Sequence, residues 1–159
     1  MSWNNDDGLY IRFGTEKPVV ALGGESTTDG NNRVITLDLT YADFAATGTE
    51  KIISEGLTIP NGAFVKSAVF TVSTAFAGAT ATLTFGLIDS DRSTAYDADG
   101  IDAAIAVTAI DAVGDEITCD GAVVGTVISN TTPVYVTATE GTAAFTAGEG
   151  QLVITYYMP

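Results

Sequence analysis

The stretch that decides the fold is Ile59–Val72, with the sequence IPNGAFVKSAVFTV, followed after a short gap by Ala81–Leu87, with the sequence ATLTFGL. Pro60 has no amide hydrogen to donate to a β-ladder, so we place it before the first strand and not within it. The pair Asn61-Gly62 accepts positive φ angles at little cost, which suits a tight turn. Gly78 lies in the short connection between the two stretches, and this spacing predicts a β-hairpin at the centre of a β-sandwich.

Both stretches alternate between apolar residues and small or polar ones. A period of two is the pattern of a β-strand with one buried face. In the second strand we expect this face to consist of Ala81, Leu83, Phe85 and Leu87. In the first strand we expect it to consist of Phe64, Ala68, Phe70 and Val72.

Further strands are predicted along the chain, separated by turns such as Asp120-Gly121 and Glu140-Gly141. Val34–Tyr41 alternates most regularly, and its apolar face would contain Ile35, Leu37, Leu39 and Tyr41. The other candidates are a short strand around Ile52-Ile53, then Ile117–Asp120, Ala122–Ile128, Val134–Thr139 and Leu152–Tyr157. Strand and helix patterns do not alternate as they do in parallel α/β proteins. We therefore predict an all-β fold, an antiparallel β-sandwich of jelly-roll-like type with one short helix and an extended N-terminal arm.

The short helix is predicted over 101–112. Asp99 is a suitable N-cap, and Ile101 and Ile105 recur at helical spacing on a face that would pack on the sandwich. The alternative is a strand over Ile105–Ile110, because apolar residues also alternate there.

Residues 1–31 differ from the remainder, and we expect an N-terminal arm there and a β-sandwich domain over 32–159. Leu9–Phe13 predicts one short strand, and the polar, Gly-rich run Gly23–Gly30 is typical of a linker. Such a strand can add to the sheet edge of another chain, or it can fold back on its own domain as an edge strand. The sequence leaves both arrangements open.

The charge balance excludes one class of partner. The chain of 159 residues carries 20 acidic and 6 basic residues, a formal net charge of −14. Neutralising phosphates requires clustered Lys and Arg, so we expect no binding to nucleic acid. Charged residues are only 16% of the chain, well below the usual quarter, which suits a surface covered by other subunits.

The residue types also argue against an enzyme. The sequence contains no histidine and a single cysteine, Cys119, which excludes Ser-His-Asp and Cys-His catalysis and zinc sites built on these residues. We predict no catalytic residue and no cofactor. The N-terminus lacks the pattern of a signal peptide, and no apolar run is long enough to span a bilayer, so we expect no membrane association and synthesis in a cytoplasm.

We expect no bound metal ion, and a cation site is the weaker alternative. Two Asp-x-Asp pairs in the acidic stretch 89–102 have the oxygen ligands that Ca²⁺ prefers. Their spacing does not match the EF-hand loop, and solvated or helix-capping carboxylates are the simpler interpretation. The four weak candidates are Asp89, Asp91, Asp97 and Asp99.

Six stretches carry a resemblance to a known family. They are Asp7–Gly14, Ile59–Ala68, Thr74–Phe76, Thr82–Leu87, Asp97–Ala106 and Phe145–Gly148. Together they resemble structural proteins from the heads of tailed bacteriophages, in particular capsid decoration, or cement, proteins. The resemblance covers most of the chain and rests on structural turns and strands.

This resemblance implies a non-enzymatic virion protein on the outer capsid surface, made in the cytoplasm of a bacterial host. It further implies a homotrimer that binds the major capsid protein and stabilises the head. The hypothesis for the capsid-contact arm comprises Leu9, Tyr10, Ile11, Arg12 and Phe13.

Two other functions are kept as alternatives. A carbohydrate- or receptor-binding head-fibre module would use exposed aromatic side chains, and the candidates are Trp3, Tyr41, Tyr96, Tyr135, Tyr156 and Tyr157. An enzyme with a paired-carboxylate site is a remote option.

Overall fold

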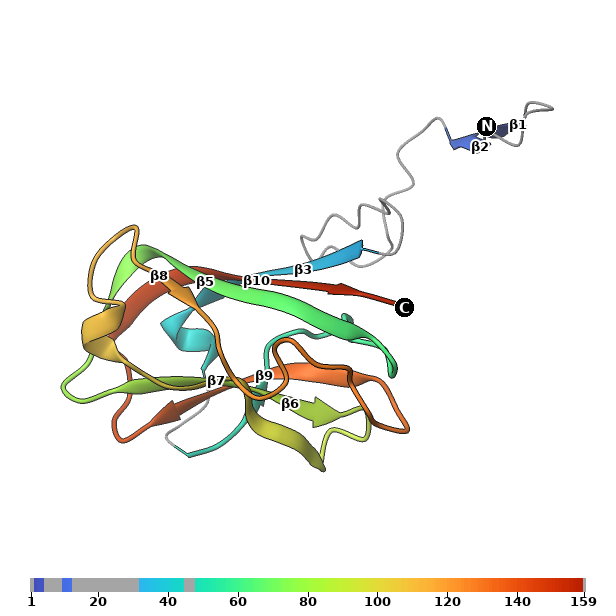
Figure 1. The fold of residues 1–159 in the computed structure, drawn as a ribbon. Coiled ribbons are helices and arrows are strands. Elements are labelled where there is room, and N and C mark those ends of the chain that lie inside the picture. The colour runs from blue at the N-terminus through green and yellow to red at the C-terminus, as the bar shows by residue number, and fades with distance from the viewer. Residues whose placement is uncertain (1, 5–9, 13–31, 45–47, 159) are drawn as a thin grey trace.

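Two antiparallel β-sheets packed face to face form the body of the protein (Figure 1). The computed structural model describes residues 2–4, 10–12, 32–44 and 48–158. The first four-stranded sheet has the order β3 (Asn32–Thr40), β10 (Ala147–Tyr157), β5 (Phe64–Ala77) and β8 (Glu116–Thr118). The second four-stranded sheet has the order β4 (Lys51–Ile52), β9 (Val134–Gly141), β6 (Thr82–Asp89) and β7 (Ala95–Ala106).

The chain changes sheet at nearly every connection. From β3 to β10 only β6 and β7 are both consecutive in sequence and neighbours in one sheet. This order is that of a double-sheet jelly roll of eight strands. The predicted all-β sandwich of jelly-roll-like type is therefore confirmed.

The hairpin predicted from the two central stretches is wrong, although both strands exist. β5 and β6 lie in opposite sheets, and the link between Ala77 and Thr82 crosses from one to the other. Gly78 makes this crossing possible, because a Cβ there would lie 2.8 Å from the Ala81 Cβ and 3.1 Å from the carbonyl oxygen of Ala144. Alternation shows which face of a strand is buried but does not identify the strand beside it.

The predicted buried face of β6 is confirmed, and that of β5 is confirmed except at its start. Ala68, Phe70 and Val72 are buried, but Val65 is fully buried in place of Phe64. The cause is an irregularity in the pairing with β10, which skips one residue of β5 between Val65 and Ser67.

The strand predicted over Val34–Tyr41 is confirmed as β3, which begins earlier, at Asn32, and ends at Thr40. Tyr41 is 43% exposed, because the chain turns into a 3₁₀ helix, η1 (Tyr41–Asp43), after Thr40. The Asp43 carboxylate fixes this turn by accepting hydrogen bonds from the Thr40 amide and hydroxyl, both at 2.8 Å.

The helix predicted over 101–112 is wrong. Ala95–Ala106 forms β7, and the only helical turn nearby is the 3₁₀ helix η2 (Val107–Ala109). Ile101 and Ile105 are both buried, but they reach the core from a strand with irregular register and a positive φ of 52° at Ala104. The irregular register of β7 therefore allows both isoleucines to be buried although their spacing is that of a helix. The alternative strand over Ile105–Ile110 is also wrong beyond Ala106.

The strand predicted over Ala122–Ile128 is wrong as well, since successive turns occupy this segment. The amide of Val124 donates to the Gly121 carbonyl at 2.9 Å, and the amide of Thr126 donates to the Val123 carbonyl at 3.1 Å. The remaining predicted strands are confirmed as β4, β8, β9 and β10, with shifted ends.

Aromatic rings fill the core between the sheets. Phe70 and Phe85 lie 5.2 Å apart between ring centroids, and Phe76 lies 5.8 Å from Phe70. Phe44 and Phe145 extend the cluster toward one end of the sandwich. Burying a side chain of this size contributes about 1.5–3 kcal/mol, so this cluster is a main source of stability.

In the region predicted as an arm, the structure describes two short strands that form a separate antiparallel pair. They are β1 (Ser2–Asn4) and β2 (Tyr10–Arg12), with Trp3 opposite Ile11. β2 falls within the strand predicted over Leu9–Phe13, whereas β1 was not predicted. The arm itself and its boundary with the sandwich at residues 31 and 32 remain predictions.

Candidate functional site

The acidic stretch 89–102 is mostly strand, and the turn within it is short. β6 ends at Asp89 and β7 begins at Ala95. Asp91 closes this turn, because its carboxylate accepts the amides of Ser93 and Thr94, both at 2.9 Å, and the Thr94 hydroxyl at 2.7 Å. These hydrogen bonds lower the pKa of Asp91 to about 2. The carboxylate shapes the turn.

The other three acidic candidates have different surroundings. The Asp89 carboxylate accepts a hydrogen bond from the side-chain amide of Asn130 at 2.5 Å. Burial, followed by the neighbouring Asp99, raises the pKa of Asp97. Within the described residues no group of three or more Cys, Asp or Glu side chains is placed to hold a metal ion. The structure therefore does not bring the four candidates together.

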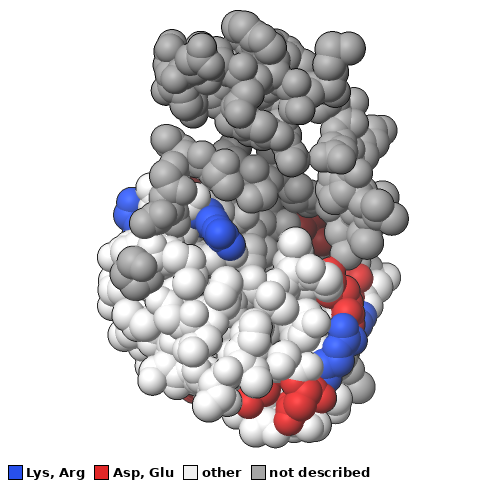
Figure 2. Space-filling view, turned by 90° about the vertical axis from the view of Figure 1, so that its right-hand side faces the viewer, with Lys and Arg blue, Asp and Glu red and all other residues white. Residues whose placement is uncertain are grey.

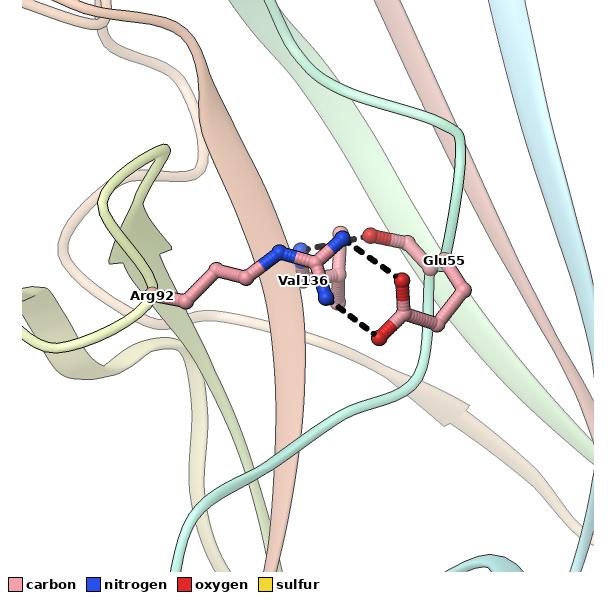
Figure 3. A network of polar contacts seen from close by, with 4 residues as sticks. Glu55, Arg92 and Val136 are labelled. Atoms are coloured by element: carbon pink, nitrogen blue, oxygen red, sulfur yellow. Dashed lines mark hydrogen bonds and ion pairs between the residues drawn. The ribbon is translucent and has the colours of Figure 1, made fainter.

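An ion pair between Arg92 and Glu55, which the sequence did not suggest, connects this turn to the loop on the other side of β9 (Figure 3). The guanidinium of Arg92 donates to both carboxylate oxygens of Glu55, at 3.0 and 2.8 Å, and lies 5.0 Å from the centroid of the Tyr135 ring. Beside it, the buried Ser54 hydroxyl accepts the amide of Val136 at 2.8 Å. About half of each charged side chain is exposed, so the pair positions two loops and adds little stability.

A buried acid and thiol face each other between β7 and the segment after β8. Asp102 is 7% exposed and Cys119 is 2% exposed. Burial, together with the adjacent Asp102, raises the pKa of the Cys119 thiol to about 12, and burial also raises the pKa of Asp102. A thiol with this pKa is protonated at neutral pH and is a poor nucleophile. Cys119 behaves as a small core residue.

A shallow hollow of about 580 Å³ lies on the outer face of the first sheet, over β3, β10 and β5. Three of its polar side chains are already engaged in hydrogen bonds, Asp38, Glu149 and Gln151. Gln151 donates to Asp38 at 2.7 Å, and Thr74 donates to Glu149 at 3.2 Å. Among the described residues no aromatic side chain lines the hollow, so this part of the chain gives it no flat apolar surface on which a sugar ring could stack.

The aromatic candidates for sugar binding have separate roles. Tyr156 is buried, and Tyr135 lies beneath Arg92. The Tyr96 hydroxyl accepts the amide of Ser129 at 3.1 Å, and Tyr157 packs on Phe64 with ring centroids 5.0 Å apart. Tyr41 is exposed in η1, and Trp3 lies in β1. Of the five tyrosine candidates, only Tyr41 is exposed.

Two segments without charged residues meet at one end of the sandwich. They are residues 56–65 and 121–134, which contain no Asp, Glu, Lys or Arg, and we call their surface the uncharged face. The Asp89 carboxylate lies at its edge, on the side-chain amide of Asn130. Backbone hydrogen bonds join the two segments, from Gly62 to Ile128 at 2.9 Å, from Ile128 to Ala63 at 2.8 Å and from Val65 to Thr126 at 2.9 Å. Figure 2 shows this side of the molecule as largely uncharged, with one basic side chain in its upper part and most other charged side chains toward its margins.

The residues predicted to contact a capsid can be placed only in part. Tyr10, Ile11 and Arg12 form β2. Leu9 and Phe13 lie outside the described residues.

Comparison with known proteins yields likenesses of fold. No protein-family model matches this sequence, and no curated protein matches it. A chain of the cyanophage Pam1 capsid asymmetric unit aligns with a TM-score of 0.57 at 17% identity, covering 92% of this chain and 98% of that one. A chain of the capsid of Ralstonia phage GP4 aligns with a TM-score of 0.53 at 16% identity, covering 91% and 92%.

The chain shares its fold with chains of two phage capsids. The likeness spans more than nine-tenths of each chain, so it concerns the whole architecture and not one common motif. The helices of the described residues are single 3₁₀ turns, and none has the length and hydropathy that crossing a membrane requires.

Proposed function

We propose that this chain is a non-enzymatic structural protein of a phage head that decorates and stabilises the capsid by binding the major capsid protein. The observation that carries the proposal is the likeness of fold to chains of two phage capsids over nearly the full length of both partners. The described residues add an extensive core of buried apolar side chains between the two sheets, which suits a structural role.

The acidity of the chain favours a position on the outer capsid surface. A net charge of −14 repels nucleic acid, so a location facing the packaged genome would be electrostatically unfavourable. We further propose that the protein is a homotrimer in the virion and is made in the cytoplasm of the bacterial host.

The N-terminal arm is proposed as the contact with the major capsid protein, through Leu9, Tyr10, Ile11, Arg12 and Phe13. The pair of β1 and β2 supports this role, because two three-residue strands are too short to be stable alone in water. Such a ribbon gains stability when it joins another sheet edge, and a capsid subunit can supply that edge.

Co-sedimentation with empty capsids of the same phage tests the proposal. The full chain is expected to pellet with the capsids, and a chain lacking residues 1–14 is expected to remain in the supernatant while retaining the thermal unfolding of the sandwich. Ile11→Asp in the full chain gives a subtler variant, expected to weaken attachment without truncation. Failure of the full chain to bind would overturn the decoration role, and full binding by the truncated chain would exclude the arm.

The carbohydrate- or receptor-binding alternative has less support, because only Tyr41 among the five tyrosine candidates presents an exposed ring. A glycan array with the full chain separates the two functions. Specific binding that is lost in Tyr41→Ala, which removes an exposed aromatic ring, would favour the alternative.

A further inference from the structure

The uncharged face is preformed and presents exposed side chains to solvent. Val127 is 47% exposed, and its backbone is bridged to that of Phe64. Thr126 and Ser129 beside it are also exposed. The backbone hydrogen bonds between residues 62–65 and 125–128 hold this surface in place, so a partner would bind it without first ordering its backbone.

The composition of this face differs from that of the whole chain. Twenty-six of the 159 residues are charged, yet residues 56–65 and 121–134 include none. Charged residues resume at its borders, with Lys66 after one segment and Asp120 before the other. Depletion of charge, with aromatic residues such as Phe64 nearby, is the compositional mark of the centre of a protein interface.

We propose that copies of this chain contact one another through the uncharged face, with Val127 at the centre of the contact. The proposal rests on the trimer put forward above and names the surface that forms it.

The net charge of the chain favours a second copy of it, rather than the capsid, as the partner that binds the uncharged face. A partner of different sequence can meet an acidic surface with its own Lys and Arg, and therefore needs no neutral face. A second copy brings the same 20 acidic and 6 basic residues, so approach through the charged surface is repulsive. Identical acidic chains can associate closely where neither carries charge.

Light scattering of the purified full chain, over a range of concentrations, tests the contact. The unaltered chain is expected to associate, and Val127→Asp is expected to reduce the mass to that of one chain at the same concentration. Association should weaken at least about tenfold, because the new carboxylate would lose its water without gaining a partner.

Val113→Asp is the matched control. Val113 is 71% exposed, and the neighbouring Gly114 bonds to Val72 near the opposite end of β5, so this valine lies far from the uncharged face. Its charge should leave the mass unchanged. Circular dichroism checks that each variant folds, which is expected because Val113 is largely exposed and Val127 is about half exposed.

Two outcomes would overturn the inference. One is an unaltered chain that stays monomeric at every concentration, and the other is a folded Val127→Asp variant that associates as strongly as the Val113→Asp control. Capsid co-sedimentation of the same samples is a separate readout. Normal attachment by a monomeric chain would reject the contact between copies and leave the decoration role intact.

Discussion

The rings of Phe70 and Phe85 lie 5.2 Å apart between centroids, and they belong to opposite sheets. Both side chains are fully buried. β5 and β6, which carry them, are consecutive in the chain, so the short link through Gly78 brings the two sheets together across this aromatic pair. The pair joins the sheets at the centre of the sandwich.

Removing one of these rings should destabilise the fold strongly. Phe70→Ala is expected to lower the free energy of unfolding by about 3–5 kcal/mol, through lost burial and the cavity left among Phe76 and Phe85. Urea unfolding followed by fluorescence or circular dichroism measures the change. Thr71→Ala is the control, since Thr71 is exposed on the outer face of the same strand and should shift stability by no more than about 0.5 kcal/mol. A loss below about 1 kcal/mol in Phe70→Ala would contradict the central role of the pair.

Gly86 should not tolerate a side chain. Leu87 pairs with Asp97 and Phe85 with Asp102, so the intervening residues of β7 bulge over Gly86. A Cβ there would overlap the Ala98 carbonyl group and come 2.9 Å from the Ala98 Cα. Gly86→Ala is expected to cost about 1–3 kcal/mol or more, because backbone must move.

Gly114→Ala is the comparison for Gly86→Ala in thermal unfolding. Nothing lies within 4 Å of a Cβ at Gly114, and its cost comes only from the positive φ of 91°, about 1–2 kcal/mol. Equal melting temperatures for Gly86→Ala and the unaltered protein would show that β7 does not cover β6 as described.

Asp102 should make the protein less stable at neutral pH than at mildly acidic pH. Burial raises the pKa of Asp102 in the folded state, so the folded protein binds this proton more tightly than the unfolded chain does. The resulting stabilisation is complete below the unfolded pKa of about 3.9 and is lost as the pH rises through the folded value. Asp102→Asn should raise the melting temperature at pH 7 and flatten its dependence on pH.

Asp91 should show the opposite sign in the same thermal scans. Its pKa of about 2 lies below the unfolded value, so its stabilisation is present above the unfolded pKa and is lost as the pH falls through the folded value. Asp91→Ala should therefore lower the melting temperature at pH 7. If Asp102→Asn also lowered the melting temperature at pH 7, the ionised carboxylate of Asp102 would stabilise the fold. That result would contradict its raised pKa.

Cys119 should resist thiol reagents in the folded protein. The side chain is 2% exposed and its pKa is raised to about 12, so both access and ionisation are suppressed. Ellman's reagent is expected to modify the thiol only at the rate of unfolding, and rapidly once denaturant is added. Fast modification of the folded protein would show that the segment after β8 opens.

The local pattern of the sequence determined the class of fold and much of the core. Alternation in β3, β6, β9 and β10 identified these strands and, in β3 and β6, the side chains that are buried, because the direction of a side chain in a regular strand depends only on its position along that strand. The same local reasoning failed where a strand is irregular, as at Val65 and between Ile101 and Ile105. A bulge shifts the period and imitates another structure.

Which segments meet was decided by the tertiary structure alone. β5 pairs with β10 and β8 and not with β6, Arg92 binds a carboxylate 37 positions away in Glu55, and the uncharged face joins residues 56–65 to 121–134. Each of these contacts depends on two distant segments whose union is favourable only when the whole sandwich closes around its core. A single stretch of sequence contains only one of the two segments that form such a contact. The alternation of a strand, in contrast, can be read from that stretch alone.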